Sequence, residues 1–120
     1  MTVRAIRGAT TAEENTREAI IESTLELLKE IEKKNDLEKA DAISIIFTVT
    51  PDLNAVFPAV AAREMGLTFV PLLDMAAPDI EGSLKKCIRV MIHINTDKTK
   101  EEIHHVYLRG AKVLRPDLAE

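Results

Sequence analysis

Two segments with strong strand character limit what this chain can fold into. The first, AISIIFTVT at 42–50, is rich in β-branched residues and almost continuously apolar, which predicts a central strand covered on both faces. The second, at 86–95, alternates instead. One of its faces carries Ile88, Val90, Ile92 and Ile94, and the other carries Cys87, Arg89, Met91 and His93. The sequence therefore predicts a sheet in which one strand turns its isoleucines and valine to one face and Arg89 to the other.

Helical patterns separate the predicted strands. Asn15-Thr16 opens an apolar stripe at helical spacing, and Asn35 predicts the C-cap of that helix. Pro58 and Gly66 suit the first turn and the end of a second, short helix. Strands and helices are thus expected to alternate along the chain.

Weaker signals complete the expected fold. Residues 2–8 and 67–71 predict short strands, 72–83 predicts a loop, and a last strand-like piece begins at Val106. Together these elements predict an α+β fold, a mixed β-sheet with helices packed on one face. Because the Arg89 face has no obvious cover within the chain, we expect an oligomer with functional residues at a subunit boundary.

Composition and charge exclude several classes of function. The chain, residues 1–120, is 46% hydrophobic, which is enough for one core and predicts a single domain. A formal net charge of −4 argues against nonspecific binding to nucleic acid or to acidic membranes. No apolar run approaches the ~20 residues of a membrane span, and no signal-peptide core stands out, so we expect a cytoplasmic protein. The single cysteine, Cys87, fits a reducing compartment.

Three arginines, Arg7, Arg89 and Arg115, lie in apolar, strand-like sequence. A guanidinium is always charged and strongly hydrated, so at such a position it usually has a carboxylate partner or lines an anion-binding cleft. The alternative is that each arginine lies on a solvated strand face. Together with Tyr107, and without a Gly-rich phosphate loop, the three arginines favour a pocket for a small organic acid.

Most motifs that carry enzyme chemistry are absent from the sequence. It has no P-loop, no GxGxxG, no Ser/His/Asp order and no cluster of Cys and His for zinc. His104 and His105 are adjacent and cannot share one helix face. Cys87 shares a strand face with Arg89, which leaves open either a lowered thiol pKa or ordinary packing of a small side chain. Such a site suits catalysis by positioning and electrostatics, and we expect no cofactor and no metal.

Four segments carry a family resemblance. They are IRGATT at 6–11, TPDLNAVFPAVAARE at 50–64, GSLKKCIRVM at 82–91 and HVYLRGAKVLRPDL at 105–118. In this order and spacing they resemble the monofunctional AroH-type chorismate mutases, the trimeric α/β class. The resemblance implies a homotrimer, with active sites between subunits, that rearranges chorismate to prephenate on the route to phenylalanine and tyrosine. It also implies a reaction without proton transfer, covalent intermediate or cofactor.

The resemblance further implies a role for each site residue. Arg89 would donate to the ether oxygen of chorismate and to a carboxylate, while Arg7 and Tyr107 would bind carboxylates. The other implied substrate-binding positions are Phe57, Leu72 and Leu114 around the ring, Arg63 and Arg115 near the mouth, and Leu73, Met75, Ala76 and Ala77. Arg7 and Arg89 would line each site from one subunit, and Phe57 and Arg63 would arrive from its neighbour.

Three positions depart from the family pattern. Val60 stands where relatives commonly have lysine, Asp74 where they have cysteine, and Ala77 where they have the glutamate that accepts from the substrate hydroxyl. An aspartate is one methylene shorter than a glutamate but lies three positions earlier here, so we expect Asp74 to act as the catalytic replacement. The alternatives are that Asp74 caps a loop or pairs with Arg7 or Arg89. 

Asp79 and Glu81 are weaker candidates for that replacement. Two other functions stay open at this point. One is a trimer that binds a dicarboxylate as a sensor with little activity, because the usual glutamate and lysine are missing. The other is an imine/enamine deaminase of similar trimeric fold, although the KKCIRVM and VLRPDL segments argue against it.

Overall fold

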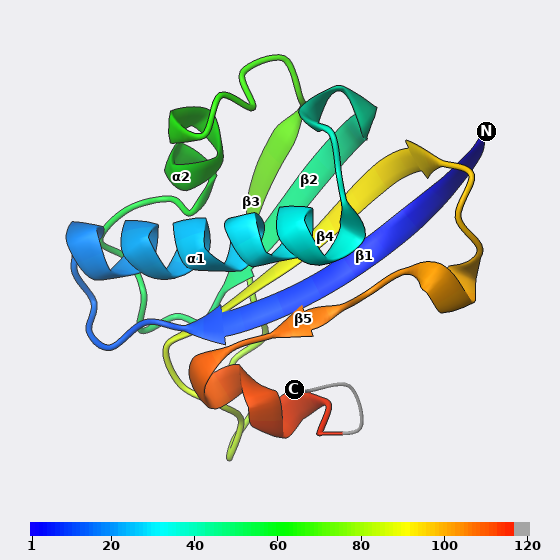
Figure 1. The fold of residues 1–120 in the computed structure, drawn as a ribbon. Coiled ribbons are helices and arrows are strands. Elements are labelled where there is room, and N and C mark those ends of the chain that lie inside the picture. Colours follow the sequence, from blue (N-terminus) through cyan, green and yellow to red (C-terminus); the bar gives the residue numbers. More distant parts are fainter. Residues whose placement is uncertain (117–120) are drawn as a thin grey trace.

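The computed structural model describes residues 1–116, and its centre is a five-stranded mixed sheet (Figure 1). The strands are β1 (Thr2–Thr11), β2 (Ala42–Val49), β3 (Leu72–Ala76), β4 (Cys87–Thr96) and β5 (Val106–Tyr107). Their order across the sheet is β3-β2-β4-β1-β5. The strand β4 runs antiparallel to both neighbours, whereas β3 is parallel to β2 and β5 is parallel to β1. The helices α1 (Arg17–Asn35) and α2 (Ala59–Glu64) both pack on one face, which confirms the predicted fold class.

The helix α1 begins where the sequence predicts. The Thr16 hydroxyl accepts a hydrogen bond from the Ala19 N–H at 3.1 Å and so caps the first turn. The buried face of the helix carries Ile20, Ser23, Thr24, Leu27, Leu28, Ile31 and Asn35. The prediction that Asn35 is the C-cap was wrong, because Asp36 takes the left-handed conformation that ends the helix, with φ of 48°. Asn35 is buried instead, and its amide bonds the backbone of His104.

The core lies between α1 and the centre of the sheet. Its members include Ile6, Phe47, Val90, Ile92, Leu27, Leu28 and Ile31. The contact is closest at Gly8, where an added Cβ would lie 2.8 Å from the Ile31 Cδ1 atom. The absence of a side chain at this position therefore lets α1 approach β1.

Two predictions about β2 and β3 were wrong. The strand β2 is covered on one face only, because Ile45 and Phe47 are buried while the alternate side chains Ile46 and Thr48 face the side without helices. The strand predicted at 67–71 forms instead at 72–76, inside the segment predicted to be a loop. Pro71 explains the shift: its carbonyl accepts from Ile45, but it has no N–H to donate, so regular pairing starts after it.

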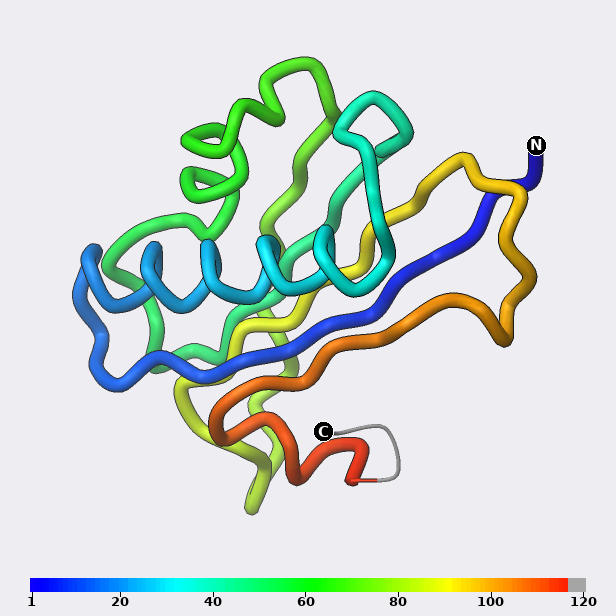
Figure 2. The backbone as a smooth tube through the Cα atoms, in the orientation of Figure 1, coloured from blue at the N-terminus to red at the C-terminus, as the bar shows by residue number. Residues whose placement is uncertain are grey.

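The C-terminal part of the chain returns to the first strand. Figure 2 shows the segment around β5 running beside β1, from the opposite end of the sequence. Thr99 and Glu102 form a capping box that starts the 3-10 helix at Lys100–Glu102. A further 3-10 helix, Arg109–Leu114, follows β5 and is tied to α1 by an ion pair between Arg109 Nε and Glu26 Oε1 at 3.0 Å. Within residues 1–116, no helix is both long enough and apolar enough to cross a membrane.

Candidate active site

The sheet face opposite the helices carries two of the predicted arginines. In the β1–β4 ladder, Arg7 lies opposite Met91 and Ala9 lies opposite Arg89. Arg7 and Arg89 are therefore diagonal neighbours on one face, with backbones roughly 7–8 Å apart. Ala9 also pairs with Tyr107 on the other side of β1, so the tyrosine belongs to the same row of residues as Arg89. The topology thus brings Arg7, Arg89 and Tyr107 together from three strands.

A cavity of about 280 Å³ opens beside the two arginines. We call it the arginine cavity, and its lining residues are Arg7, Ile46, Thr48, Ala77, Pro78, Arg89, Val90 and Met91. The Nε atom of Arg89 is buried and has no hydrogen-bond partner among residues 1–116. None of the ion pairs between residues 1–116 involves Arg7 or Arg89. Two adjacent guanidinium groups without a carboxylate are an electrostatic arrangement that an anionic ligand would stabilise.

Tyr107, Leu114 and Arg115 lie at the β5 end of the same face. Tyr107 is buried against Ala9 and Ala111, and Leu114 packs on this cluster. Arg115 follows the last 3-10 helix and is exposed, and its charge acts on His105. These positions place the predicted tyrosine, leucine and arginine along one border of the arginine-bearing face.

A second cavity, of about 530 Å³, lies where the loop after β2 meets β3. We call it the edge cavity, and it is lined by Val49, Leu53, Asn54, Ala55, Val56, Phe57, Pro58, Asp74, Met75 and Ala76. Phe57 is 67% exposed and Met75 is 49% exposed, although both are large and apolar. The predicted substrate-binding positions Phe57, Met75 and Ala76 therefore belong to a different cavity from Arg7 and Arg89.

Asp74 faces the helix side of the sheet. It lies opposite Phe47, which is fully buried under the helices, whereas Arg89 lies opposite Thr48 on the other face. Its Oδ1 atom accepts from the Ala59 N–H at 3.1 Å, at the first residue of α2. Within the chain, Asp74 therefore does not meet Arg7 or Arg89; its carboxylate accepts from the first N–H of α2 instead, and neither the loop cap nor the arginine pair considered above is formed.

Burial raises the pKa of the Asp74 carboxyl above its ordinary value. The hydrogen bond from Ala59 and the charge of Arg63 act in the opposite direction and only partly offset burial. Arg63 itself is exposed on α2 and is not among the residues that line the edge cavity, although its charge acts on Asp74. A nearby guanidinium favours the ionised form, but desolvation dominates at this carboxyl.

The remaining predicted positions divide between the two sides of β3. Leu73 lies opposite Ile46, on the arginine side, and is 55% exposed. Leu72 lies opposite Ile45 and packs against the core, outside both cavities. Ala77 lines the arginine cavity, with its N–H bonded to the Val49 carbonyl at 2.8 Å. 

Asp79 and Glu81 are exposed and line neither cavity. Cys87 is buried, and burial raises the pKa of its thiol although Arg89 acts in the opposite direction. Of the two interpretations of Cys87, ordinary packing is therefore the one that the structure favours.

Sequence reasoning missed three residues around the arginines. Ile46 and Thr48 line the arginine cavity, and the alternate positions of the 42–50 segment could have pointed to them. Because the 42–50 strand was predicted to be covered on both faces, these alternate positions were expected to be core residues rather than cavity residues. The third is His105, whose Nδ1 atom accepts from the backbone N–H of Arg7 at 2.9 Å. Nothing in the sequence pattern indicates this contact.

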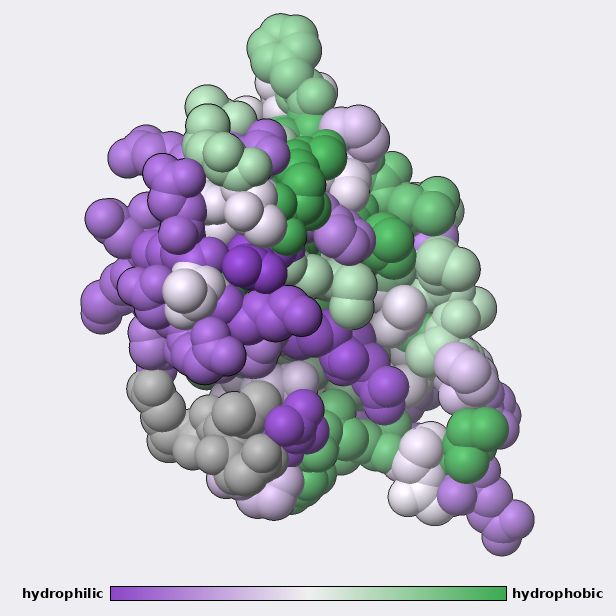
Figure 3. All heavy atoms as spheres, turned by 90° about the vertical axis from the view of Figure 1, so that its right-hand side faces the viewer, coloured by the Kyte–Doolittle hydropathy of each residue, from purple (hydrophilic) through white to green (hydrophobic). Residues whose placement is uncertain are grey.

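The surface between the two cavities is apolar. Figure 3 shows hydrophobic side chains gathered on the right-hand side of that view and hydrophilic ones on the left. Leu73 and Met75 are the exposed apolar side chains of β3, and Phe57 lies on the adjacent loop. Exposed apolar groups of this size beside a functional cavity are typical of a protein interface.

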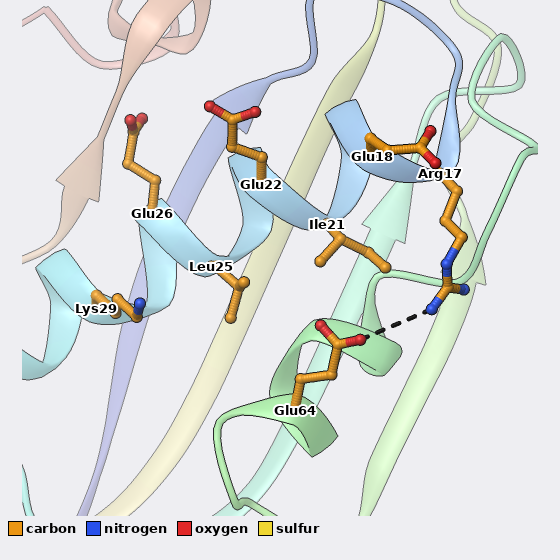
Figure 4. A pocket seen from close by; sticks show the side chains of 8 residues that line it. All are labelled: Arg17, Glu18, Ile21, Glu22, Leu25, Glu26, Lys29 and Glu64. Carbon is orange, nitrogen blue, oxygen red and sulfur yellow. Dashed lines mark ion pairs between the residues drawn. The ribbon is translucent and has the colours of Figure 1, made fainter.

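A third cavity, of about 470 Å³, lies on the helix side and holds none of the predicted site residues (Figure 4). Arg17 and Glu64 form an ion pair across it at 3.7 Å, and Ile21 and Leu25 point from α1 toward α2. Its lining residues are Arg17, Glu18, Ile21, Glu22, Leu25, Glu26, Lys29 and Glu64. Since acidic side chains surround it, this cavity does not suit an organic acid.

Comparison with known proteins identifies the family of the chain. Residues 3–118 match the family model of chorismate mutase type I. The chain is 48% identical to the chorismate mutase AroH of Bacillus subtilis (strain 168) over 120 residues, which cover 99% of this chain and 94% of that protein. It is also 48% identical to the chorismate mutase AroH of Thermus thermophilus over 117 residues, which cover 97% and 96% of the two chains.

A solved structure gives the same result. The chorismate mutase from Clostridium thermocellum superposes with a TM-score of 0.90 at 61% identity, over 92% of this chain and 98% of that one. At this similarity, over nearly the whole length, both the fold and the family are established. This chain belongs to the type I chorismate mutase family.

Proposed function

We propose that the chain is a chorismate mutase that rearranges chorismate to prephenate, with the arginine cavity as the catalytic half of a site shared between subunits. The observation that carries this assignment is the pair Arg7 and Arg89 on one sheet face, without carboxylate partners among residues 1–116. The family membership names the reaction, and the cavity supplies the charges that the reaction needs.

The chemistry is an intramolecular Claisen rearrangement. The ether C–O bond breaks ahead of C–C bond formation, so negative charge grows on the ether oxygen and positive character grows on the ring. Arg89 donates to the ether oxygen, and its unpartnered Nε atom is a donor already fixed in place. Because the strand holds this donor before the substrate binds, no reorganisation is needed as charge develops.

Conformer selection is the second contribution. Tyr107 lies in the same row of residues as Arg89, Arg7 lies diagonally beside that row, and the two bind the substrate carboxylates. Fixing both carboxylates holds the enolpyruvyl group over the ring in the compact conformer that reacts. Proton transfer plays no part in this step, in agreement with a cavity whose charged lining residues are arginines.

We further propose that the complete site forms between subunits of a homotrimer. Each subunit has an arginine cavity on one side of β3 and an edge cavity with Phe57 and Asp74 on the other. The exposed apolar side chains Leu73 and Met75 lie beside both and would be buried by a neighbour. The edge cavity of the neighbour then supplies the ring wall, and its Asp74 faces the developing positive charge.

The direct test is the conversion of chorismate to prephenate by the purified chain and by Arg89→Ala. Removing one preorganised donor to a developing oxyanion typically costs ~3–4 kcal/mol, so kcat should fall by roughly 10²–10³. Arg17→Ala is the matched control, because Arg17 lies in the acidic cavity on the helix side. If the wild type binds chorismate without turnover, the sensor alternative is supported. If Arg89→Ala turns over within about threefold of wild type, Arg89 is not the main donor to the ether oxygen.

A further inference from the structure

On the side of β1 that faces β5, the backbone N–H of Arg7 is bonded by a side chain, whereas on the other side Arg7 belongs to the β1–β4 ladder. The strand β5 pairs with β1 only at Gly8 and Ala9, and this ladder continues to Leu108, whose N–H donates to the Ala9 carbonyl at 2.9 Å. At the next position toward the N-terminus of β1, the Arg7 N–H donates to Nδ1 of His105 at 2.9 Å. The imidazole thus extends the ladder by one residue, at the residue whose guanidinium enters the arginine cavity.

This contact fixes the protonation state of the ring. A histidine nitrogen that accepts a hydrogen bond carries a lone pair, so the imidazole must be neutral with its proton on Nε2. A doubly protonated ring would turn a second donor toward the Arg7 N–H, and the hydrogen bond would be lost. The charge state of His105 therefore decides whether the Arg7 N–H is anchored on the β5 side of β1, where the β1–β4 ladder does not hold it.

The charges around His105 favour the neutral ring. Burial lowers the pKa of His105, and the charges of Arg115, Arg7 and His104 act in the same direction. A cavity of about 210 Å³ beside the ring brings further charged groups from the elements packed against it, namely Glu30 and Lys34 of α1 and Lys112 of the last 3-10 helix. Glu30 is the acidic member of this set, and the cations outnumber it.

We propose that His105 is a positioning residue for Arg7: its neutral imidazole holds the Arg7 backbone, and protonation releases it and weakens binding of the substrate carboxylate at acid pH. This inference rests on the proposed function, in which Arg7 binds a substrate carboxylate. It adds His105 as a residue that acts through Arg7 without touching the substrate. A carboxylate clamp acts on the ground state and the transition state alike, so its loss raises KM more than it lowers kcat.

The kinetic test compares pH profiles of three variants. In the wild type, KM for chorismate should rise as pH falls below the ordinary histidine range, while both substrate carboxylates stay ionised above about pH 5. His105→Ala should show a KM raised about tenfold at every pH, without the acid rise. His105→Asn keeps an acceptor that does not titrate, so it should recover most of that loss and also lack the acid rise. His104→Asn, at the exposed adjacent histidine, should keep the wild-type profile.

A second measurement does not depend on activity. The ¹⁵N shifts of the His105 ring should report the Nε2–H tautomer at neutral pH, and the Arg7 amide shift should titrate together with the ring. If the chain lacked mutase activity but showed this coupling, the proposed function would fail and the positioning role would stand. An Arg7 amide that does not follow His105, or an acid KM rise retained in His105→Asn, would overturn the proposal.

Discussion

The guanidinium of Arg89 is the group on which the proposed chemistry depends most. Its Nε atom is buried and unpartnered, and the side chain is fixed on a central strand between β1 and β2. A guanidinium offers several donors in a rigid plane, so it can reach the ether oxygen and a carboxylate at once. This geometry, rather than charge alone, is what the site would lose on substitution.

We therefore predict that Arg89→Lys rescues little of the activity lost in Arg89→Ala. An ammonium group is a single point charge and cannot make both contacts of the planar group. The measurement is kcat for chorismate in the two variants under the same conditions. A lysine variant within about tenfold of wild type would show that charge suffices at this position.

Asp74 combines a structural contact with the proposed catalytic one. Its Oδ1 atom caps α2 through Ala59, while the charge of the carboxylate is the property that the reaction would use. Asp74→Asn retains an acceptor oxygen for the cap but removes the charge. We predict a fall in kcat/KM of at least tenfold, about 1.4 kcal/mol, with a urea midpoint close to that of wild type. Asp74→Ala should lose the cap as well, at a cost of about 1 kcal/mol in the free energy of unfolding.

The family pattern provides a stringent control for Asp74. Asp74→Cys combined with Ala77→Glu rebuilds the common arrangement, and Ala77 lines the arginine cavity, so the new carboxylate would lie near Arg7 and Arg89. This double variant should recover much of the activity lost in Asp74→Asn. If Asp74→Asn is nearly silent while changes at Asp79 or Glu81 are damaging, the carboxylate has been assigned to the wrong residue.

The pH dependence that follows from Asp74 has a definite sign. Burial raises the pKa of this carboxyl, so the group protonates at a higher pH than an ordinary aspartate as the pH falls. The activity that depends on its charge should therefore decline on the acid side of the profile, and Asp74 should add no basic limb near neutrality. The decline should appear in kcat, which separates it from the KM effect expected of His105, and it should vanish in Asp74→Asn.

At the scale of the elements, α1 packs on β1 so tightly at Gly8 that no side chain fits there. A Cβ at position 8 would lie 2.8 Å from Ile31 Cδ1 and 3.1 Å from Val90 Cγ1. Overpacking of a close-packed core typically costs 1–3 kcal/mol. We predict that Gly8→Ala lowers the free energy of unfolding by about 1–3 kcal/mol in urea denaturation.

A double-mutant cycle can identify the cause of that loss. Ile31→Val removes the Cδ1 methyl that the new Cβ would meet first. In the Gly8→Ala background this change should restore stability, although Ile31→Val alone should cost about 0.5–1.5 kcal/mol. Additive losses in the double variant would mean that Gly8 is required for a reason other than contact with Ile31.

At the scale of the whole molecule, one subunit carries two unlike half-sites. The arginine cavity supplies the cations, and the edge cavity supplies Phe57 and a carboxylate. The two cavities share no lining residue, so we propose that they meet between subunits rather than within one. A cyclic trimer in which each edge cavity meets the arginine cavity of a neighbour would form three equivalent sites.

Mixing inactive variants tests this arrangement. Arg89→Ala and Arg63→Ala each damage every site of their own trimer, but a mixed trimer contains sites whose two halves are both intact. After co-refolding at equal amounts, we predict that about a quarter of the wild-type sites regain activity, because each half is intact with even probability. The formation of mixed trimers is verified by mass. If the activity of the mixture does not exceed the sum of the two separate variants, the site lies within one subunit.

The sequence determined those features that depend on local chemistry. The alternation at 86–95 placed Arg89 on the face opposite Val90 and Ile92, and the structure has the same division. Neighbouring residues also predicted the cap at Thr16 and the short helix between Pro58 and Gly66. The order of strand and helix patterns along the chain predicted the mixed sheet with helices on one face. Periodicity and caps act over a few residues, so one chain read in order reveals them.

Contacts between distant segments were decided only by the tertiary structure. The side of the sheet that Asp74 faces depends on its register against Phe47. Thr48 lies on an uncovered face because the helices pack on the other face of the sheet. The anchoring of Arg7 by His105 joins positions 98 residues apart. Register, coverage and such long-range hydrogen bonds are properties of the assembled sheet, because a shift of one residue reverses the facing of every side chain on a strand.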